Sequence, residues 1–382
     1  MALALAAAQI DAARSQRPPA TPGATLGLVY FSDRYVPQAQ ALLEDLHQRW
    51  PGVAWVGCPA VGIAATGVEY FDEPALALML CDLPEGSFEV FSGARPLSAD
   101  PSRRAHTALV HVDPATPDLA ELVDELSHRV ETGYLFGGAV SARTGGAQIA
   151  DGWWQGGLSG VGFGPQVLLV SRVTQGCQPV GPERTVTAAE GHVVTELDGL
   201  PAMTCLLRDL AIELQDPRKA LPVLRATLVG LTDADGALLG RGDQFGPDVR
   251  VRHLVGLDPG RQAVAVAERV EPGMRLAFCQ RHTEAARRDL VRICSEIRDE
   301  VEGEGEEAPA AMGGVGSGPR IRGAVYISCN GRGGPHFGAP SAELKIVQRA
   351  LGDVPLVGFF AAGEIARRHL YGYTGVLTVF RA

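Results

Sequence analysis

Apolar residues near the start of the chain alternate between continuous runs and a helical spacing. Leu26–Ser32, Val53–Val56 and Ala75–Leu80 are mostly apolar runs that predict buried strands. Between the first two runs, large apolar residues recur on one face of a helix: Leu42, Leu43, Leu46 and Trp50. Pro51-Gly52 ends this helix. The predicted order is strand, helix, strand, strand.

The same order returns twice. The second copy has apolar runs on either side of a predicted helix: Ala108–Val112, Tyr134–Phe136 and Leu158–Phe163. The third copy has its runs around a helix predicted from Ser341 to Leu351: Gly323–Ser328, Leu356–Gly358 and Gly375–Phe380. Strands that alternate with helices predict an α/β (α+β) fold of mixed sheets, built from repeated strand-helix-strand-strand units with helices on one face.

A short sequence pattern recurs near both ends of the chain. Val53–Gly62 and Val354–Gly363 share V-x-x-V-G-x-x-A-x-G, and each follows a helix and a run that contains Val-Tyr (Val29-Tyr30, Val325-Tyr326). Gly137-Gly138 forms a third glycine turn at about the equivalent position of the middle copy. Glycines let the backbone approach a ligand closely, so these turns are the first candidates for a binding site.

The region between the second and third copies has a different pattern. It is richer in strand signals: Ala226–Leu231, Val249–Val255, Ala263–Val270 and Met274–Cys279. A charged helix is predicted from Thr283 to Val301. The acidic and glycine-rich stretch 302–320 follows, and we expect it to be a mobile insertion. Its G-x-G repeats do not connect a strand to a helix, which argues against a dinucleotide-binding loop.

Length and charge restrict the class of protein. The 382 residues exceed one typical domain, so we expect two domains that share an interface. The net charge of -10 offers nucleic acid no basic surface. The sequence contains no apolar run long enough to span a membrane, so we expect neither nucleic acid nor membrane as a partner. We interpret the alanine-rich residues 1–24 as a flexible segment with a frayed or amphipathic helix rather than a signal peptide.

Cysteine and histidine spacing argues against a metal centre. The seven cysteines are widely spaced without a C-x-x-C pair, and the nine histidines are scattered. This usage is typical of reduced thiols, so we expect a cytoplasmic protein without a metal or other cofactor.

The densest group of polar residues and glycines is Ser328–Gly334, which follows directly on a predicted buried strand. Its glycines leave amide groups pointing outward, and Arg332 offers a planar fork for a carboxylate or phosphate. Glu364 follows the last glycine turn. An ammonium group bound by Glu364 and a carboxylate bound by Arg332 would form a clamp for an amino acid. The alternatives are a structural turn, or a direct pair between Arg332 and Glu364. The earlier turn has only Asp33 and Ile63 nearby, so we expect the ligand at the later one.

A thiol-dependent enzyme is a further alternative. Cys329 would be its nucleophile and His336 its base, since cysteine chemistry needs a thiol of lowered pKa and a nearby base. We favour a structural role for Cys329 as a small residue at a strand end, and the same applies to Cys58. We therefore assign no catalytic residue.

Together these motifs resemble the FIST family, whose members carry FIST N and FIST C domains in tandem. Val56-Gly57-Cys58 with Gly62 resembles the family's first turn, although Ile63 stands where a glutamate is frequent. The middle segments are Phe136-Gly137-Gly138, Thr174–Gly181 and Val193–Ala202. The C-terminal signature is similar to Ser328–Gly333, Phe337-Gly338 and Val354–Ile365.

The resemblance implies a FIST N-like domain at 25–200 and a FIST C-like domain at 201–382. It also implies a sensory protein that binds a small molecule such as an amino acid and signals through a separate partner protein. An interaction scaffold is the alternative. The candidate ligand-binding residues are Ser328, Cys329, Asn330, Gly331, Arg332, Phe337, Gly358, Gly363, Glu364, Gly57, Cys58, Gly137 and Gly138.

Overall fold

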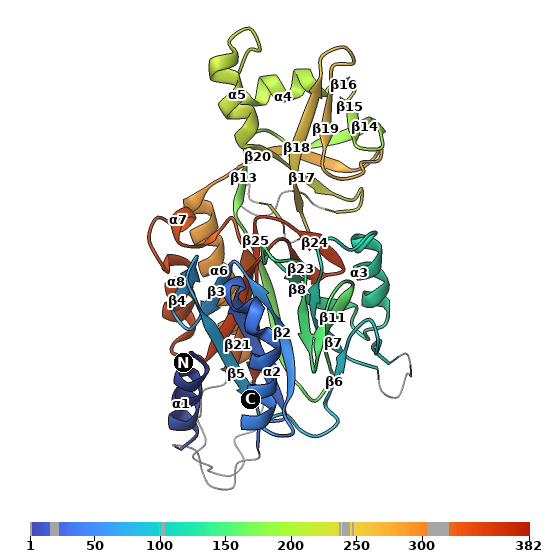
Figure 1. Ribbon diagram of the computed structural model, residues 1–382. Coiled ribbons are helices and arrows are strands. Elements are labelled where there is room, and N and C mark those ends of the chain that lie inside the picture. The colour runs from blue at the N-terminus through green and yellow to red at the C-terminus, as the bar shows by residue number, and fades with distance from the viewer. Residues whose placement is uncertain are drawn as a thin grey trace. The chain divides into compact units, whose positions relative to one another are not determined.

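The structure is a computed structural model with mixed sheets and helices (Figure 1). It describes residues 2–15, 23–98, 100, 104–236, 238, 245–246, 248–303 and 321–382. From residue 304 onward, the insertion predicted at 302–320 lies outside the described residues. The chain forms two compact units. The first comprises Met1–Thr174, Leu290–Leu370 and Thr374–Ala382, and the second Gln175–Asp289 and Tyr371–Tyr373.

The first unit contains three copies of one structural motif, as the sequence pattern predicts. Repeat 1 consists of β1 (Leu26–Ser32), the 3-10 helix η1 (Asp33–Gln38), α2 (Ala39–Arg49), β2 (Ala54–Ala60), β3 (Gly62–Ala65), β4 (Val68–Phe71) and β5 (Leu76–Cys81). Repeat 2 consists of β7 (Thr107–Val112), α3 (Leu119–His128), β8 (Tyr134–Ala139), β9 (Gln148–Ala150), β10 (Trp153–Trp154) and β11 (Leu158–Phe163). Repeat 3 consists of β21 (Ile321–Cys329), α7 (Gly333–Phe337), α8 (Ala342–Leu351), β22 (Leu356–Ala361), β23 (Glu364–Arg367), β24 (His369–Tyr371) and β25 (Thr374–Arg381).

Each repeat builds the centre of one sheet from its first, second and last strands. The first two strands pair in parallel, and the last strand pairs antiparallel to the first. The sheets have the orders β10-β9-β2-β1-β5, β24-β23-β8-β7-β11-β6 and β12-β25-β21-β22-β3-β4. Here β6 is Phe88–Phe91 and β12 is Leu169–Gln175.

The hairpin in the middle of each repeat joins the sheet of another repeat. The hairpin β3–β4 of repeat 1 pairs with β22 of repeat 3, and β23–β24 of repeat 3 pairs with β8 of repeat 2. The hairpin β9–β10 of repeat 2 pairs with β2 of repeat 1, which closes the cycle. Each of these three sheets therefore contains strands from two different repeats.

One glycine in each repeat fixes how the three copies align. Gly57, Gly137 and Gly358 lie opposite Val29, Val110 and Tyr326 in the parallel strand pairs. A Cβ atom on any of these glycines would overlap the carbonyl oxygen of the opposite residue. The close approach of the two strands thus requires glycine, and these three positions are structurally equivalent.

This alignment corrects the apparent match between the two Val-Tyr pairs. Tyr326 is equivalent to Val29, whereas Tyr30 is equivalent to Ile327. Successive side chains of a strand point to opposite faces, so the two tyrosines lie on opposite faces of their sheets. Tyr30 contacts His111 through a hydrogen bond of 3.1 Å and stacks on Phe359, both fully buried.

In the first two repeats, the sheet face opposite to the one that carries Tyr30 is covered by a helix through apolar contacts. In repeat 1, Val29 and Phe31 of β1 belong to one buried cluster with Leu43 and Leu46 of α2. In repeat 2, Val110 and Val112 of β7 pack in a cluster with Val123 and Leu126 of α3. Figure 1 shows α3 beside this sheet. Burial of such side chains stabilises each layer by about 1.5–3 kcal/mol per residue.

The rest of the first unit includes an N-terminal helix, α1 (Ala2–Arg14), within the segment 1–24 that the sequence assigns as flexible. Ala7 of this helix is buried, and Arg14 donates a hydrogen bond of 3.0 Å to Asp82. Residues 16–22 lie outside the described part of the chain. The charged helix predicted from Thr283 is α6 (Thr283–Gly303).

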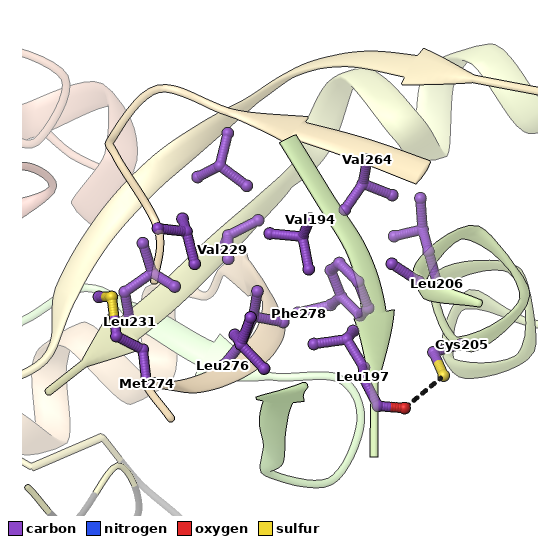
Figure 2. Packing of buried hydrophobic residues seen from close by; sticks show 14 of the residues in the cluster. Val194, Leu197, Cys205, Leu206, Val229, Leu231, Val264, Met274, Leu276 and Phe278 are labelled. Atoms are coloured by element: carbon purple, nitrogen blue, oxygen red, sulfur yellow. Dashed lines mark hydrogen bonds between the residues drawn. The ribbon is translucent and has the colours of Figure 1, made fainter. Parts of the chain in front are cut away.

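The second unit is a closed six-stranded barrel. Its strands pair in the order β14-β15-β19-β18-β17-β20, and β20 pairs back with β14. Val194, Val229, Leu276 and Phe278 fill its core together with residues of α4 such as Leu206 (Figure 2). The elements are β13 (Cys177–Pro179), β14 (Arg184–Glu190), β15 (Val193–Leu197), β16 (Leu200–Pro201), α4 (Ala202–Leu210), α5 (Pro217–Ala226), β17 (Thr227–Thr232), β18 (Arg250–Asp258), β19 (Ala263–Val266) and β20 (Arg275–Arg281).

Candidate ligand-binding site

The helix-facing layer of repeat 3 is polar where the other two repeats are apolar. Tyr326 takes the place of Val29 and Val110, and Ser328 takes the place of Phe31 and Val112. Both side chains face α8, which contributes Glu343 from its first turn. The layer between sheet and helix is therefore apolar in repeats 1 and 2 and built from hydrogen-bonding side chains in repeat 3.

Glu343 is the centre of this polar layer. Its Oε1 accepts hydrogen bonds from Tyr326 Oη at 2.7 Å, Ser328 Oγ at 3.0 Å and Arg332 Nε at 2.8 Å. Its Oε2 accepts the backbone N–H of Gly333 at 3.0 Å. Glu343 is fully buried and Arg332 is 3% exposed, so both charged groups are desolvated. Such a pair persists only with several hydrogen bonds to compensate the lost hydration.

The loop after β21 brings Arg332 into this position. Asn330 donates its backbone N–H to Ala361 at 2.8 Å, which ties the loop to the end of β22. Gly333 has a φ of +69°, and a Cβ atom there would meet the ring of Phe71, so the turn needs glycine. The guanidinium of Arg332 lies 5.2 Å from the ring centre of Phe337, a cation–π contact.

A second buried glutamate arrives from repeat 1 through the exchanged hairpin. Glu69 of β4 accepts the backbone N–H groups of Glu343 at 2.9 Å and Leu344 at 3.2 Å, both in the first turn of α8. Ser341 Oγ accepts the N–H of Glu69 at 3.0 Å. Burial and then the charge of Glu343 raise the pKa of Glu69 to about 7, although hydrogen bonds from the backbone oppose this rise. Glu69 thus caps a helix that belongs to another repeat.

Glu364 is the third buried glutamate near Arg332. Its Oε2 accepts hydrogen bonds from the N–H of Thr374 at 3.1 Å and from Thr374 Oγ1 at 2.7 Å. Among the described residues, its Oε1 has no hydrogen-bond partner, although Glu364 is fully buried. Burial raises the pKa of Glu364 to about 8, against the opposing effects of Thr374 and the positive charge of Arg332.

The positions equivalent to Glu364 in the other repeats are not acidic. Ala64, Ile149 and Ile365 lie opposite the three equivalent glycines, so the preceding residues Ile63, Gln148 and Glu364 correspond. Ile63 is fully buried and apolar. The buried amide of Gln148 donates to the carbonyl groups of Gly146 and Gly157, at 3.3 and 3.2 Å, and accepts from Ser159 Oγ at 2.5 Å. The fold thus accepts isoleucine or glutamine at this position.

The structure brings together most of the residues that the sequence selects. Ser328 and Cys329 end β21, and 330–332 form the loop that leads to α7, whose last residue is Phe337. Gly363 lies between β22 and β23, and Glu364 is the first residue of β23. Gly138 pairs with Glu364, and Ala139 next to it donates its N–H to Gly363 at 2.8 Å. Gly137 and Gly358 lie within their strands, where close strand packing accounts for them. Gly57 and Cys58 lie in the sheet of repeat 1, at the positions equivalent to Gly358 and Phe359.

The two cysteines singled out from the sequence differ in environment. Cys58 is fully buried, and burial raises the pKa of its thiol well above the usual value, which disfavours a reactive thiolate. Cys329 is 8% exposed, and its Sγ lies 4.0 Å from Asn330 Oδ1. The ring of His336 lies edge-on to that of Phe337, 5.6 Å between centres.

Three residues of the cluster escaped the sequence reasoning: Glu343, Glu69 and Tyr326. An acidic residue in the first turn of a helix is usual on a solvent-facing surface, so Glu343 gave no sign of burial. Glu69 follows a glycine turn at which the sequence offers no clamp for a ligand, and only the exchange of hairpins brings it to α8. Tyr326 was noted in the sequence as part of a Val-Tyr pair, but the pair in repeat 1 that matches it in letters is shifted by one residue in register.

Two kinds of site are not found in the part of the chain that the structure describes. Within those residues, no three histidine, cysteine, aspartate or glutamate side chains are grouped so that they could hold a metal ion. Over the same residues, no helix combines the length and the apolar character needed to cross a bilayer.

Comparison with known proteins agrees with the domain signature. A family model of the FIST N domain matches residues 25–200, and one of the FIST C domain matches residues 202–367. The chain is 32% identical over 376 residues to an uncharacterized protein of Mycobacterium tuberculosis, covering 93% of this chain and 91% of that one. It is 30% identical over 372 residues to an uncharacterized protein of Mycobacterium bovis, covering 93% and 90%. The two compact units divide the chain at other places than the two family models.

Proposed function

The chain belongs to the FIST family, and we propose that it is a sensory protein that binds a small ligand at the cluster around Glu343, Arg332 and Glu364. FIST domains are generally described as sensory domains that bind small ligands in signal transduction. The ligand class that we propose is an amino acid or a related metabolite, and the signal passes to a separate partner protein. We also propose a cytoplasmic location, which the seven free cysteines support.

The observation that carries this proposal is the polar layer of repeat 3. Buried polar and charged groups destabilise a fold unless they are well paired, and two equivalent layers in the same molecule are built without them. A polar layer in one repeat of three is therefore better explained by function than by folding. Its position supports the same conclusion, because ligands of α/β sheets bind outside the carboxyl ends of parallel strands.

Measuring the melting temperature of the protein against a panel of amino acids, amines and organic acids tests the proposal. A ligand at about a hundred times its Kd stabilises the native state by about 2.7 kcal/mol, so the melting temperature rises by several degrees. We expect at least one compound to give a saturable rise that Ser328→Ala weakens. The matched control is Ser159→Ala in repeat 2, which should leave the rise unchanged. The proposal fails if no compound acts, or if both variants respond as the unaltered protein does.

A further inference from the structure

Resting on the proposed function, we propose that Glu364 binds the ammonium group of a small primary amine, and that a carboxylate on the ligand is not required. This differs from a clamp in which Arg332 binds the carboxylate of an amino acid. In the structure, Glu343 supplies a charge partner to Arg332 at 2.8 Å. The recognised group is therefore a cation, and its ligand is Glu364.

The balance of buried charge favours a cation. Glu343 and Glu364 act through their charges on one buried guanidinium, that of Arg332, and Glu343 in turn acts on the buried Glu69. Arg332 offsets one of the three carboxylates. The remaining negative charge must be neutralised by protons or by a bound cation, because an isolated carboxylate is very costly in a buried site.

Glu364 is the carboxyl group that is best placed to receive the cation. Glu69 Oε1 accepts two N–H groups in the first turn of α8, and Glu343 has four hydrogen bonds from its neighbours. Glu69 Oε2 also has no hydrogen-bond partner among the described residues, but it lies beside the backbone of Gly334. Glu364 Oε1 has no hydrogen-bond partner among the residues the structure describes, while Oε2 is held by Thr374. An ammonium group has three donors, so it can satisfy this oxygen directly.

The equivalent residues show that the fold does not need an acid at this position. Gln148 has its amide oxygen and nitrogen hydrogen-bonded, and Ile63 has no polar group. Of the three equivalent residues, only Glu364 has a side-chain oxygen without a hydrogen-bond partner within the described part of the chain. A metal cation is a poorer fit than an ammonium group, because the described residues offer no group of three metal ligands.

Binding should release a proton. Arg332 and Glu343 are the charged groups that act on Glu364, and Thr374 holds its second oxygen. With a pKa of about 8, the free carboxyl is mostly protonated at pH 7. The ammonium group replaces this proton, which passes to the buffer. The affinity for an amine should therefore increase about tenfold per pH unit from pH 6 to pH 8 and level off above that.

The test uses methylamine and 1,4-diaminobutane as amines, acetate and succinate as carboxylates, and glycine as a zwitterion. Melting temperatures are measured with the full chain, with Glu364→Gln, and with Glu121→Gln as an exposed control in the first turn of α3. Calorimetric titration in two buffers of different ionisation enthalpy counts the protons released. We expect a saturable rise with an amine that Glu121→Gln keeps and Glu364→Gln loses, and release of close to one proton at pH 7.

The outcomes separate this inference from the proposed function. If only the carboxylates stabilise the protein and Glu364→Gln changes their effect, the amine assignment is wrong and the ligand site stands. If the amines act equally on Glu364→Gln, or no proton is released, the amine assignment is also wrong. If none of these five compounds stabilises the protein, the amine assignment is contradicted, and the proposed function is contradicted only if the wider panel of amino acids, amines and organic acids also has no effect.

Discussion

Glu364 and Gln148 occupy equivalent positions in two copies of one structural motif, one as an acid and the other as an amide. Both are fully buried on a strand that pairs beside a required glycine of another repeat. Gln148 is neutral and fully hydrogen-bonded, whereas Glu364 is ionisable and has one oxygen without a partner among the described residues. The repeat thus provides its own control for the role of the acid.

The first prediction concerns the pH dependence of stability. The pKa of Glu364 is about 8 in the folded protein against an ordinary value of 4.5, so between these values the folded state holds a proton that the unfolded state lacks. The contribution of Glu364 to the free energy of unfolding is fully present below pH 4.5, and it is lost as the pH rises toward 8. Glu364→Gln has no such group to deprotonate. Its free energy of unfolding, measured with urea, should therefore rise relative to that of the unaltered protein by up to about 1.4 kcal/mol per pH unit between pH 4.5 and pH 8.

Each measurement on Glu364→Gln is compared with the unaltered protein at the same pH. Glu69 also has a raised pKa, but it is present in both proteins, so its effect cancels in the difference between their free energies of unfolding. Parallel stability profiles for the two proteins from pH 5 to pH 8 would show that Glu364 is not a buried, protonated acid.

The second prediction concerns the pair of Arg332 and Glu343. Glu343→Gln leaves the guanidinium of Arg332 buried without its carboxylate, which should reduce the free energy of unfolding by about 3–5 kcal/mol. Glu125→Gln is the matched control, because Glu125 forms an exposed pair with Arg129 one helical turn away, and it should cost less than about 0.5 kcal/mol. Urea unfolding of both variants measures the difference, and equal losses would refute the assignment.

The third prediction concerns Glu69 as a helix cap supplied by another repeat. Glu69→Ala leaves the N–H groups of Glu343 and Leu344 without their acceptor, at a cost of about 1–3 kcal/mol. Amide hydrogen exchange should show lower protection at these two residues. Glu69→Gln keeps an acceptor oxygen and should retain most of the protection. Unchanged exchange in the alanine variant would mean that the hairpin β3–β4 does not support α8.

The fourth prediction concerns the three equivalent glycines. Alanine at Gly57, Gly137 or Gly358 would place Cβ on the carbonyl oxygen of the adjacent strand, so each change should destabilise the fold by more than about 4 kcal/mol. Gly93→Ala meets no atom within 4 Å and should change stability by less than about 0.5 kcal/mol. Thermal melting of the four variants measures this. A mild effect at any of the three would show that its strand pair tolerates a side chain.

Local pattern was sufficient to predict the repeats. The runs around Leu26–Ser32 and Gly323–Ser328, each followed by a helix face and a glycine, correspond to repeats 1 and 3 of the structure. Hydrophobic periodicity is set by which face of an element is buried, and this is a local property. The same pattern drew attention to Arg332 and Glu364, which both prove to be buried.

The partners of these residues could not be predicted, because they depend on long-range pairing. Glu69 reaches α8 only because β3 pairs with β22, nearly three hundred residues away in sequence (the hydrogen bond from Glu343 to Glu69 spans 274 positions). The two Val-Tyr pairs look alike in sequence, yet a shift of one residue in register places Tyr30 and Tyr326 on opposite faces. Sequence similarity between repeats therefore identified the motif but not its alignment.

The most direct test of the central claim, that Glu364 serves a ligand rather than the fold, is the melting temperature of the unaltered protein and of Glu364→Gln at pH 7.5, each with and without the best compound of the panel. The account predicts that Glu364→Gln melts at an equal or higher temperature without ligand and shows no rise when the compound is added. A variant that melts lower than the unaltered protein and still gains the full rise with the compound would contradict it.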